Sequence, residues 1–334
     1  MPDVSDRLGE AERKAEFLMS YPALAFAFLF CAAATMVLCL YARPICAALG
    51  LIDEPGSRKK HANATPLAGG VVLQFVVAPI LLFLALVLSP VLWAAKLLII
   101  VAATMAMTLV GLADDRHTLS AHDRLLVSFL VFGSASIIDP LFNVRVLIFD
   151  YPSFQLGLGN AWLAVVFTTI CCVGLVNAIN MADGKNGLVI GLCLGWLGLL
   201  WLRAPLPLVP AIVVIIAALL VLLVFNLRGR LFLGDGGAYG LATAIGLIAI
   251  AIYNSPGGHG GRAVSANELV LLFAIPVLDS FRLTFARLRR GQSPMAGDHD
   301  HLHHHLHTWF GWPLGLFVYW VLSLLPSMRF FLSG

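Results

Sequence analysis

Long apolar runs separated by short polar segments dominate the chain. A helix that crosses the ~30 Å hydrocarbon core of a bilayer needs ~20 largely apolar residues. Ten segments approach or reach this length, and we expect each to form a membrane-spanning helix. They lie at about residues 22–42, 66–88, 91–112, 122–139, 161–178, 187–203, 206–226, 237–254, 268–281 and 312–332. The pattern therefore predicts an all-α polytopic membrane protein with about ten spans.

The polar segments between these runs are too short for a soluble domain, the longest gap being about thirty residues. We therefore expect a single integral membrane domain over residues 1–334. Residues 1–20 form a polar N-terminal segment of mixed charge, unlike the pattern of a signal peptide. Residues 282–311 are expected to form a histidine-rich cytoplasmic loop.

Composition supports membrane insertion: 60% of the residues are hydrophobic and 12% are charged. Soluble domains carry roughly 45–50% apolar and ~25% charged residues. These proportions exclude an ordinary cytosolic enzyme, a disordered protein and a nucleic-acid binder. The six cysteines lie in apolar stretches without regular spacing, so we interpret them as packing residues and not as disulfides or zinc ligands.

The basic residues predict an orientation. Thirteen of the 21 Lys and Arg residues fall in alternate loops, and eight fall on the opposite side. Because cytoplasmic loops carry the excess of Lys and Arg, the first set is expected in the cytoplasm and both termini outside.

Four polar clusters stand at the ends of spans, where buried polar groups are costly and seldom accidental. Successive clusters are separated by two spans, so all four should emerge on the same, basic face. They are Asp114-Asp115; Asn177, Asn180, Asp183 and Asn186; Asp235; and the run from Asp298 to His307.

Carboxylates and amide oxygens gathered in this way suit Mg²⁺, which takes oxygen ligands and usually keeps waters and substrate phosphates in its shell. Arginine, lysine and histidine donors suit phosphate oxygens. A cytoplasmic position at the lipid interface suggests one soluble phosphorylated substrate and one membrane-bound substrate. The combination favours magnesium-assisted phosphoryl-type transfer.

Each cluster taken alone also has a structural interpretation. The Asp114-Asp115 pair is typical of a solvated helix cap, and Asp235 or Asp183 followed by glycine is typical of a turn. Asp279 with Arg282 three residues later is typical of an ion pair at a helix end. The five histidines between 301 and 307 are harder to explain as solvated surface. Helical spacing would put His301, His304 and His305 on one side and His303 and His307 on another.

Five motifs follow one another along the chain: DEPGSRKKHANATPLAGG (53–70), GLADDRHTLS (111–120), NAINMADGKNGL (177–188), FLGDGG (232–237) and RLRRGQSPMAGDHDHLHHHL (287–306). In this order they resemble the polyprenyl-phosphate N-acetylhexosamine-1-phosphate transferases, and most closely the bacterial undecaprenyl-phosphate N-acetylglucosamine-1-phosphate transferase branch. The resemblance extends from about Ile52 to Leu306.

The resemblance implies a glycosyl-1-phosphate transferase of the bacterial inner membrane, with its active site on cytoplasmic loops. A UDP-N-acetylhexosamine, most simply UDP-GlcNAc, would give its sugar 1-phosphate to undecaprenyl phosphate, releasing UMP. Mg²⁺ would be the cofactor, with Mn²⁺ as a substitute. Besides the two substrates, the implied partners are membrane lipids and a second copy in a homodimer, with no nucleic acid. The lipid product would initiate a surface glycan such as lipopolysaccharide O-antigen or a cell-wall polymer.

The resemblance also implies roles for individual residues. Asp235 and Asn180 would bind the metal, and Asp114, Asp115, Asp183, His301, His303 and His304 would be catalytic. Substrate binding would fall to Arg58, Lys59 and His61 near the lipid phosphate, and to Phe232, Asn186 and Asn177 for the nucleotide sugar.

The chain departs from the family pattern at a few positions. Asn186 replaces an aspartate, although its amide still offers a donor and an acceptor to uracil. Ala238 stands where serine is common, which removes one hydroxyl, and His305 stands where arginine is common. The identity of the sugar and the polymer that it enters stay open.

Two other classes of function compete with the transferase. A metal-ion transporter would use the histidine run as a collector, but transporters place ionisable residues near the bilayer midplane, whereas these acids stand at span ends. An assembly scaffold does not explain why four polar clusters share one face.

Overall fold

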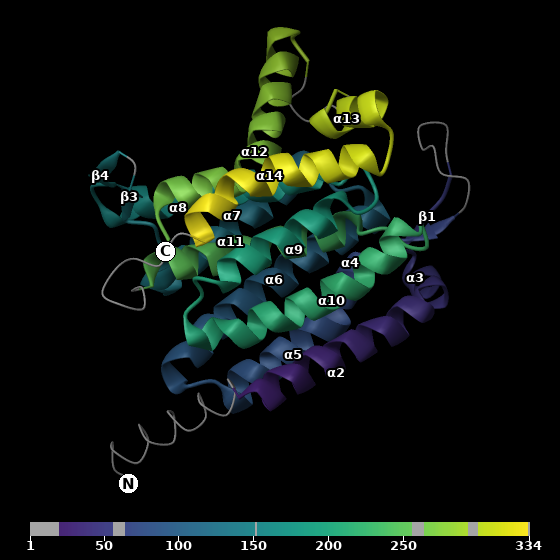
Figure 1. Cartoon of the computed structure of the whole chain (residues 1–334), viewed down its shortest axis with the longest axis horizontal. Coiled ribbons are helices and arrows are strands. Elements are labelled where there is room, and N and C mark those ends of the chain that lie inside the picture. Colours follow the sequence, from purple (N-terminus) through teal and green to yellow (C-terminus); the bar gives the residue numbers. More distant parts are fainter. Residues whose placement is uncertain (1–19, 56–63, 151, 256–263, 293–299, 333–334) are drawn as a thin grey trace. The chain divides into compact units, whose positions relative to one another are not determined.

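The computed structural model describes residues 20–55, 64–150, 152–255, 264–292 and 300–332 (Figure 1). By its internal contacts the chain divides into two compact units. Unit 1 comprises Met1–Arg116 and Ala204–Gly240, and unit 2 comprises His117–Arg203 and Leu241–Gly334. The single integral domain expected from the sequence stays a prediction.

Unit 1 is built mainly from apolar helices, with α2 packed along α10 (Figure 1). Two short π-helical segments, η1 and η2, interrupt the span that begins at α4. The elements are α2 (Tyr21–Leu40), α3 (Ala42–Leu49), β1 (Ile52–Asp53), β2 (Thr65–Pro66), α4 (Gly69–Val72), η1 (Leu73–Val77), α5 (Ala78–Phe83), η2 (Leu84–Leu88), α6 (Val91–His117), η4 (Leu206–Leu208), α10 (Val209–Leu227) and the beginning of α11 (Gly234–Asn254).

The described residues of unit 2 form the remainder of α11 and six further α-helices. Among these, α12 packs against α8 and α14. An antiparallel hairpin, β3–β4, joins α7 to α8 and pairs Val146 with Gly157. The elements are α7 (Ala121–Ile138), η3 (Pro140–Phe142), β3 (Val146–Asp150), β4 (Ser153–Gly157), α8 (Ala161–Ala182), α9 (Leu188–Trp201), α12 (Ala266–Arg289), α13 (Leu302–Phe310) and α14 (Leu314–Leu332).

Within the described residues, eight helices are long and apolar enough to cross a membrane. Two shorter apolar helices, Leu188–Trp201 and Leu314–Met328, occupy the other two segments expected to span. The 14 residues of α9 extend only ~21 Å at 1.5 Å per residue, which is shorter than the hydrocarbon core. The chain is thus an all-α polytopic membrane protein, as predicted, whereas the number of ten spans is not confirmed.

Helix α12 is longer than its apolar run suggested. The span expected to end at residue 281 continues to Arg289, and part of the expected loop forms α13. The span is expected to end where hydropathy falls, at Asp279 and Arg282. In the structure the guanidinium of Arg282 lies 3.0 Å from a carboxylate oxygen of Asp279, and the helix continues through both residues. A capping box between Ser265 and Glu268 fixes the beginning of the helix.

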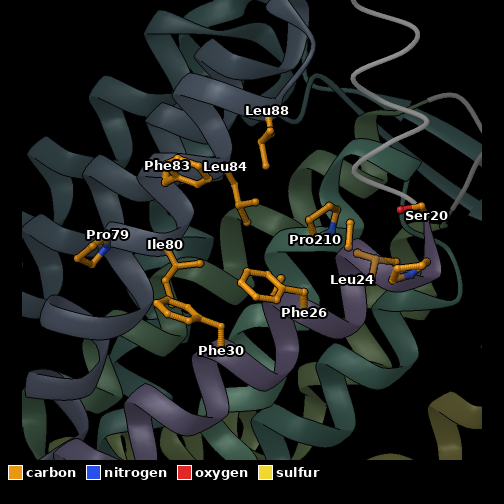
Figure 2. A pocket seen from close by; sticks show the side chains of 13 residues that line it. Ser20, Leu24, Phe26, Phe30, Pro79, Ile80, Phe83, Leu84, Leu88 and Pro210 are labelled. Carbon is orange, nitrogen blue, oxygen red and sulfur yellow. The ribbon is translucent and has the colours of Figure 1, made fainter.

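Unit 1 also contains an apolar cavity of about 810 Å³ between α2, α5, η2 and α10. In Figure 2, Phe26 and Phe30 of α2 lie beside Ile80 of α5, and Pro210 of α10 contributes to the lining. Among the described residues, none of the site residues expected from the sequence lines this cavity.

Candidate active site

In unit 1, α4, α6 and the N-terminal turn of α11 meet at glycines, where an added side chain would collide with the neighbouring backbone. A Cβ atom on Gly111 of α6 would collide with the backbone of Asp235, and one on Gly70 would lie 2.9 Å from the backbone of Gly236. The absence of side chains lets the backbones come into contact. The acidic residues that follow Gly111 are thereby brought to the beginning of α11.

The carboxylate of Asp115 caps the N-terminus of α11. Its Oδ1 accepts the backbone N–H of Asp235 at 2.9 Å, and its Oδ2 accepts that of Gly236 at 3.0 Å. The first N–H groups of a helix have no partner within the helix, and the helix dipole favours an anion there. Gly234, with φ of 72°, makes the turn that opens α11 against this carboxylate. The structure therefore places the acidic pair and Asp235 together, 120 residues apart in sequence.

The neighbouring carboxylate, Asp114, is held by a residue that the sequence reasoning missed. The hydroxyl of Tyr239 donates to Oδ2 of Asp114 at 3.2 Å, and both side chains are buried. Tyr239 follows Asp235 by four residues, so both lie on the same side of α11. The four-residue spacing from Asp235 could have indicated Tyr239 from the sequence. A tyrosine on the same side of the helix as Asp235 would be buried, and a buried phenol normally needs a hydrogen-bond partner.

Phe232 is fixed just before α11. Its N–H donates to the carbonyl of Pro66 at 2.9 Å, and its carbonyl accepts the N–H of Ala68 at 3.0 Å. These bonds form a parallel bridge between Phe232 and Leu67. The backbone of the aromatic residue expected to bind uracil is thus tied to the segment that leads into α4. The expected lipid-phosphate residues Arg58, Lys59 and His61 lie outside the described residues.

A second polar network lies in unit 2, where Asp279 of α12 organises the start of α13. Its Oδ2 lies 3.0 Å from Nδ1 of His301, and its two oxygens lie 3.2 Å from the backbone N of Leu302. Arg282 donates to Asp279 at 3.0 Å and also bonds Asp300. His305 lies 2.7 Å from Asp300, and this hydrogen bond is the main reason that the pKa of Asp300 is lowered.

His303 lies at the centre of the histidine run and is 1% exposed. Neither of its ring nitrogens has a hydrogen-bond partner within the described part of the chain. Burial lowers the pKa of His303 to about 3, and the neighbouring charges of His304, His301 and Lys185 act in the same direction. The imidazole is therefore neutral at pH 7 and can donate one N–H and accept one hydrogen bond.

The expectation that helical spacing separates His301 from His303 is wrong. His301 is the N-cap residue of α13, with φ −68° and ψ 148°, so its side chain does not follow helical geometry. The two rings stack with centroids 5.4 Å apart and an interplanar angle of 11°. Asp298 and His299, from the same run, lie outside the described residues.

The end of α8 brings the asparagine segment to the histidines within unit 2. A Cβ on Gly184 would lie 2.5 Å from Nε2 of His303, so the glycine backbone packs directly against this ring. Asp183 is the C-cap residue of α8, and Asn180 lies in its last turn. Asn177 donates to the carbonyl of Val173 in its own helix.

The remaining substrate residue proposed for this segment, Asn186, lies three residues after Asp183. Its backbone carbonyl accepts the indole N–H of Trp312 at 3.2 Å. Its backbone is therefore tied to the residues between α13 and α14. This contact leaves the side-chain amide for another role.

Comparison with known proteins decides the class of this chain. Residues 97–253 match the model of glycosyl transferase family 4. The undecaprenyl-phosphate alpha-N-acetylglucosaminyl 1-phosphate transferase of Yersinia pestis is 30% identical over 290 residues, which cover 84% of this chain and 75% of that protein. The chain belongs to glycosyl transferase family 4.

Two further relatives support this membership. The protein of the same name from Escherichia coli K12 is 28% identical over 81% of this chain and 72% of its own length. The probable undecaprenyl-phosphate N-acetylglucosaminyl 1-phosphate transferase of Bacillus subtilis is 26% identical over 77% of this chain and 70% of its own length. As a member of family 4, the chain is a glycosyl-1-phosphate transferase, which confirms the enzyme class expected from the five motifs. The transporter alternative is not supported.

The donor set at the α6–α11 junction fits magnesium better than a transition metal. No group of three His, Cys, Asp or Glu side chains among the described residues could hold a metal ion by itself. Mg²⁺ does not need such a group, because it is usually bound through one or two carboxylates together with waters and substrate phosphates. Asp114 and Asp235 supply oxygen donors of this type.

Proposed function

We propose that this family 4 enzyme transfers N-acetylglucosamine 1-phosphate from UDP-GlcNAc to undecaprenyl phosphate at the cytoplasmic face of the bacterial inner membrane. The products would be undecaprenyl-pyrophosphate-GlcNAc, which initiates a surface glycan, and UMP. One observation carries the proposal: Asp115 binds the N-terminus of α11 and so brings the acidic pair to Asp235. The names of the three relatives supply the substrate class.

The reaction requires little general-base catalysis. A phosphate monoester has a second pKa near ~6, so the lipid acceptor is mostly a dianion at neutral pH. One of its oxygens forms a bond to the β-phosphorus of UDP-GlcNAc. The bond from that phosphorus to the oxygen bridging to the α-phosphate breaks, and UMP leaves with the electron pair.

The main barrier is the repulsion between the lipid dianion and the diphosphate. Asp235 and Asp114 would hold Mg²⁺ in unit 1, and Asn180 is the further ligand proposed from the family motif. When bound, Mg²⁺ supplies positive charge that screens this repulsion and stabilises the UMP leaving group. The protein then contributes mostly positioning and charge neutralisation.

The residues of unit 2 would serve the pyrophosphate and sugar. His301, with Nδ1 directed to Asp279, would present its Nε2 to a phosphate oxygen, and neutral His303 would donate a hydrogen bond without adding charge. His304 and Asp183 complete the proposed catalytic set. Phe232 would stack on uracil, with Asn186 and Asn177 as further nucleotide-sugar contacts and Arg58, Lys59 and His61 at the lipid phosphate.

The order of bond making can take two forms. In the direct route the lipid phosphate attacks UDP-GlcNAc. In double displacement the carboxylate of Asp114 or Asp115 first attacks the β-phosphorus and releases UMP, and the lipid phosphate then displaces the carboxylate from the resulting aspartyl phosphate, which still carries GlcNAc. Both oxygens of Asp115 accept backbone N–H groups and one oxygen of Asp114 accepts the Tyr239 hydroxyl, so these lone pairs are engaged and both carboxylates are weakened as nucleophiles. We therefore favour the direct route. Label retained on the protein from [β-³²P]UDP-GlcNAc, in the absence of lipid acceptor, would contradict it.

The function is tested with purified protein in detergent, undecaprenyl phosphate, Mg²⁺ and a panel of UDP-N-acetylhexosamines, with UMP release as the signal. We expect UMP with UDP-GlcNAc, loss of the signal with EDTA, and recovery with Mg²⁺ or Mn²⁺. Absence of UMP with every sugar would refute the proposal, and release with a different sugar only would correct the donor. The proposed homodimer is tested separately by mass measurement of the detergent-solubilised protein.

A further inference from the structure

Helix α11 is attached to α6 at two points, one helical turn apart, and both attachments use the acidic pair. Asp115 accepts the backbone N–H groups at the beginning of α11, and Asp114 accepts the hydroxyl of Tyr239. The first contact sets the position of the helix end along α6. The second, four residues later, restricts rotation of α11 about its axis, because Tyr239 and Asp235 lie on the same side.

The environment of the Tyr239–Asp114 contact makes it energetically significant. Tyr239 is 4% exposed and Asp114 is 6% exposed, so water competes weakly for either group. A hydrogen bond to a charged acceptor contributes more than a neutral one, and a buried carboxylate that loses a donor pays a desolvation cost. The adjacent residue, Ala238, has no side-chain donor, so the phenol is the hydroxyl that this turn of α11 offers to α6.

We propose that Tyr239 is a positioning residue that holds the Asp114 carboxylate in register with Asp235, so that their oxygens can share one divalent cation. In this role Tyr239 would act through Asp114 and would not itself bind substrate or metal. The inference rests on the proposed function for its catalytic consequence, but the arrangement of the two carboxylates can be tested without turnover.

Tyr239→Phe removes the hydroxyl and retains the buried ring. Tyr253→Phe is the matched control on the same helix, because the Tyr253 hydroxyl donates to the carbonyl of Val146 at 2.7 Å and accepts the N–H of Ile148 at 2.9 Å. Binding of Mn²⁺, measured by the loss of the free-ion signal in electron paramagnetic resonance, is the readout that does not depend on activity. We expect Tyr239→Phe to bind Mn²⁺ about ten-fold more weakly than the wild type and Tyr253→Phe to bind it within two-fold.

Turnover provides a second readout. We expect Tyr239→Phe to lower kcat for UMP release about ten-fold while the KM for UDP-GlcNAc stays within two-fold. A residue that merely stabilises the fold would lower the melting temperature of Tyr239→Phe and Tyr253→Phe alike, without a selective effect on Mn²⁺ affinity. Mn²⁺ affinity and kcat of Tyr239→Phe within two-fold of wild type would overturn the proposal.

A double variant tests whether Tyr239 acts through Asp114. If it does, Tyr239→Phe combined with Asp114→Asn should bind Mn²⁺ no more weakly than Asp114→Asn alone. Additive losses would overturn the proposal, as would a wild-type protein that binds no Mn²⁺. A wild-type protein that binds Mn²⁺ but releases no UMP would refute the proposed function, while the Mn²⁺ titrations would still decide the role of Tyr239.

Discussion

The Nδ1 atom of His301 lies 3.0 Å from Oδ2 of Asp279, and both side chains are buried. The same carboxylate accepts the N–H of Leu302 and the guanidinium of Arg282. One acidic side chain on α12 therefore sets both the first turn of α13 and the orientation of the first histidine of the run. An imidazole whose Nδ1 is directed to a carboxylate presents its other nitrogen to a ligand.

Replacement of Asp279 should impair the reaction through His301. In Asp279→Asn the side chain loses its charge and one of its two acceptor oxygens, so it cannot satisfy His301, Leu302 and Arg282 together. We expect kcat for UMP release to fall about 10- to 100-fold, as for other groups that orient a ligating or catalytic histidine. Asp139→Asn is a suitable control because Asp139 caps Leu141 at 2.8 Å elsewhere in unit 2. A kcat of Asp279→Asn within two-fold of wild type would contradict this role.

The cap made by Asp115 should be visible in stability. Asp115→Asn replaces one acceptor oxygen by an NH₂ group that faces the backbone N–H groups of α11. We expect a loss of about 1–3 kcal/mol in the free energy of unfolding, since a buried donor is left without its partner. Chemical unfolding in detergent measures this loss. Asp123→Asn in α7 is an exposed control: it weakens the bond that Asp123 accepts from the Ser120 hydroxyl at 2.6 Å, so we expect a loss below about 1 kcal/mol. Equal stability of the two variants would argue against the cap.

Asp235 is expected to be essential for catalysis. Asp235→Asn keeps the shape of the side chain but removes a charged metal ligand, and we expect at least a hundred-fold loss of rate, roughly 3 kcal/mol in activation free energy. The measurement is UMP release at saturating UDP-GlcNAc and increasing Mg²⁺. Near-normal turnover in this variant would remove Asp235 from the proposed metal site.

The contact between Gly184 and His303 can be tested by adding one methyl group. Gly184→Ala would place a Cβ against the His303 ring, so the ring must move and we expect both activity and stability to fall, the latter by about 1–3 kcal/mol. Gly174→Ala in α8 is the matched control, because a Cβ there meets nothing within 4 Å. This control should be neutral or stabilising by roughly 0.4–1 kcal/mol. Equal activity of the two variants would show that the ring position does not matter for turnover.

His303 should make the protein less stable in acid. Its pKa is about 3 in the folded protein, because of burial among His301, His304 and Lys185 and despite the opposing charge of Asp279, whereas an unfolded histidine has a pKa near ~6.5. Between these values the unfolded chain binds more protons, so stability is lost as the pH falls below about 6.5. From pH 7 to pH 5 this amounts to about 2 kcal/mol.

The variant His303→Gln isolates this effect, since glutamine does not titrate. We expect its free energy of unfolding to fall less than that of wild type between pH 7 and pH 5. Denaturant unfolding at the two pH values measures the difference. Identical pH dependence of the two proteins would show that His303 does not remain neutral in the fold.

Much of the candidate site could be predicted because its residues lie in short contiguous motifs that can be recognised in the sequence. The acidic pair, Asp235 and the histidine run were proposed as site residues from the sequence, and the structure brings Asp115 to Asp235 and Gly184 to His303. Tyr239 and Asp279 were missed as site residues. Asp279 was interpreted from its own helix as an ion pair with Arg282, and Tyr239 was assigned no role, whereas Asp114 and His301, which they contact, lie on other elements.

The sequence by itself determined that this is a helical membrane protein and indicated which residue types are candidates for its chemistry. A membrane-spanning helix is recognised from the mean hydropathy of ~20 consecutive residues, and this quantity does not depend on how the helices pack against one another. Tertiary structure alone decided which oxygen meets which N–H group, where α12 ends, and how His301 turns toward His303. These features depend on the rotation of each helix and on close approach at glycines, and contacts between residues far apart in sequence, such as Asp115 with Asp235, contribute to both.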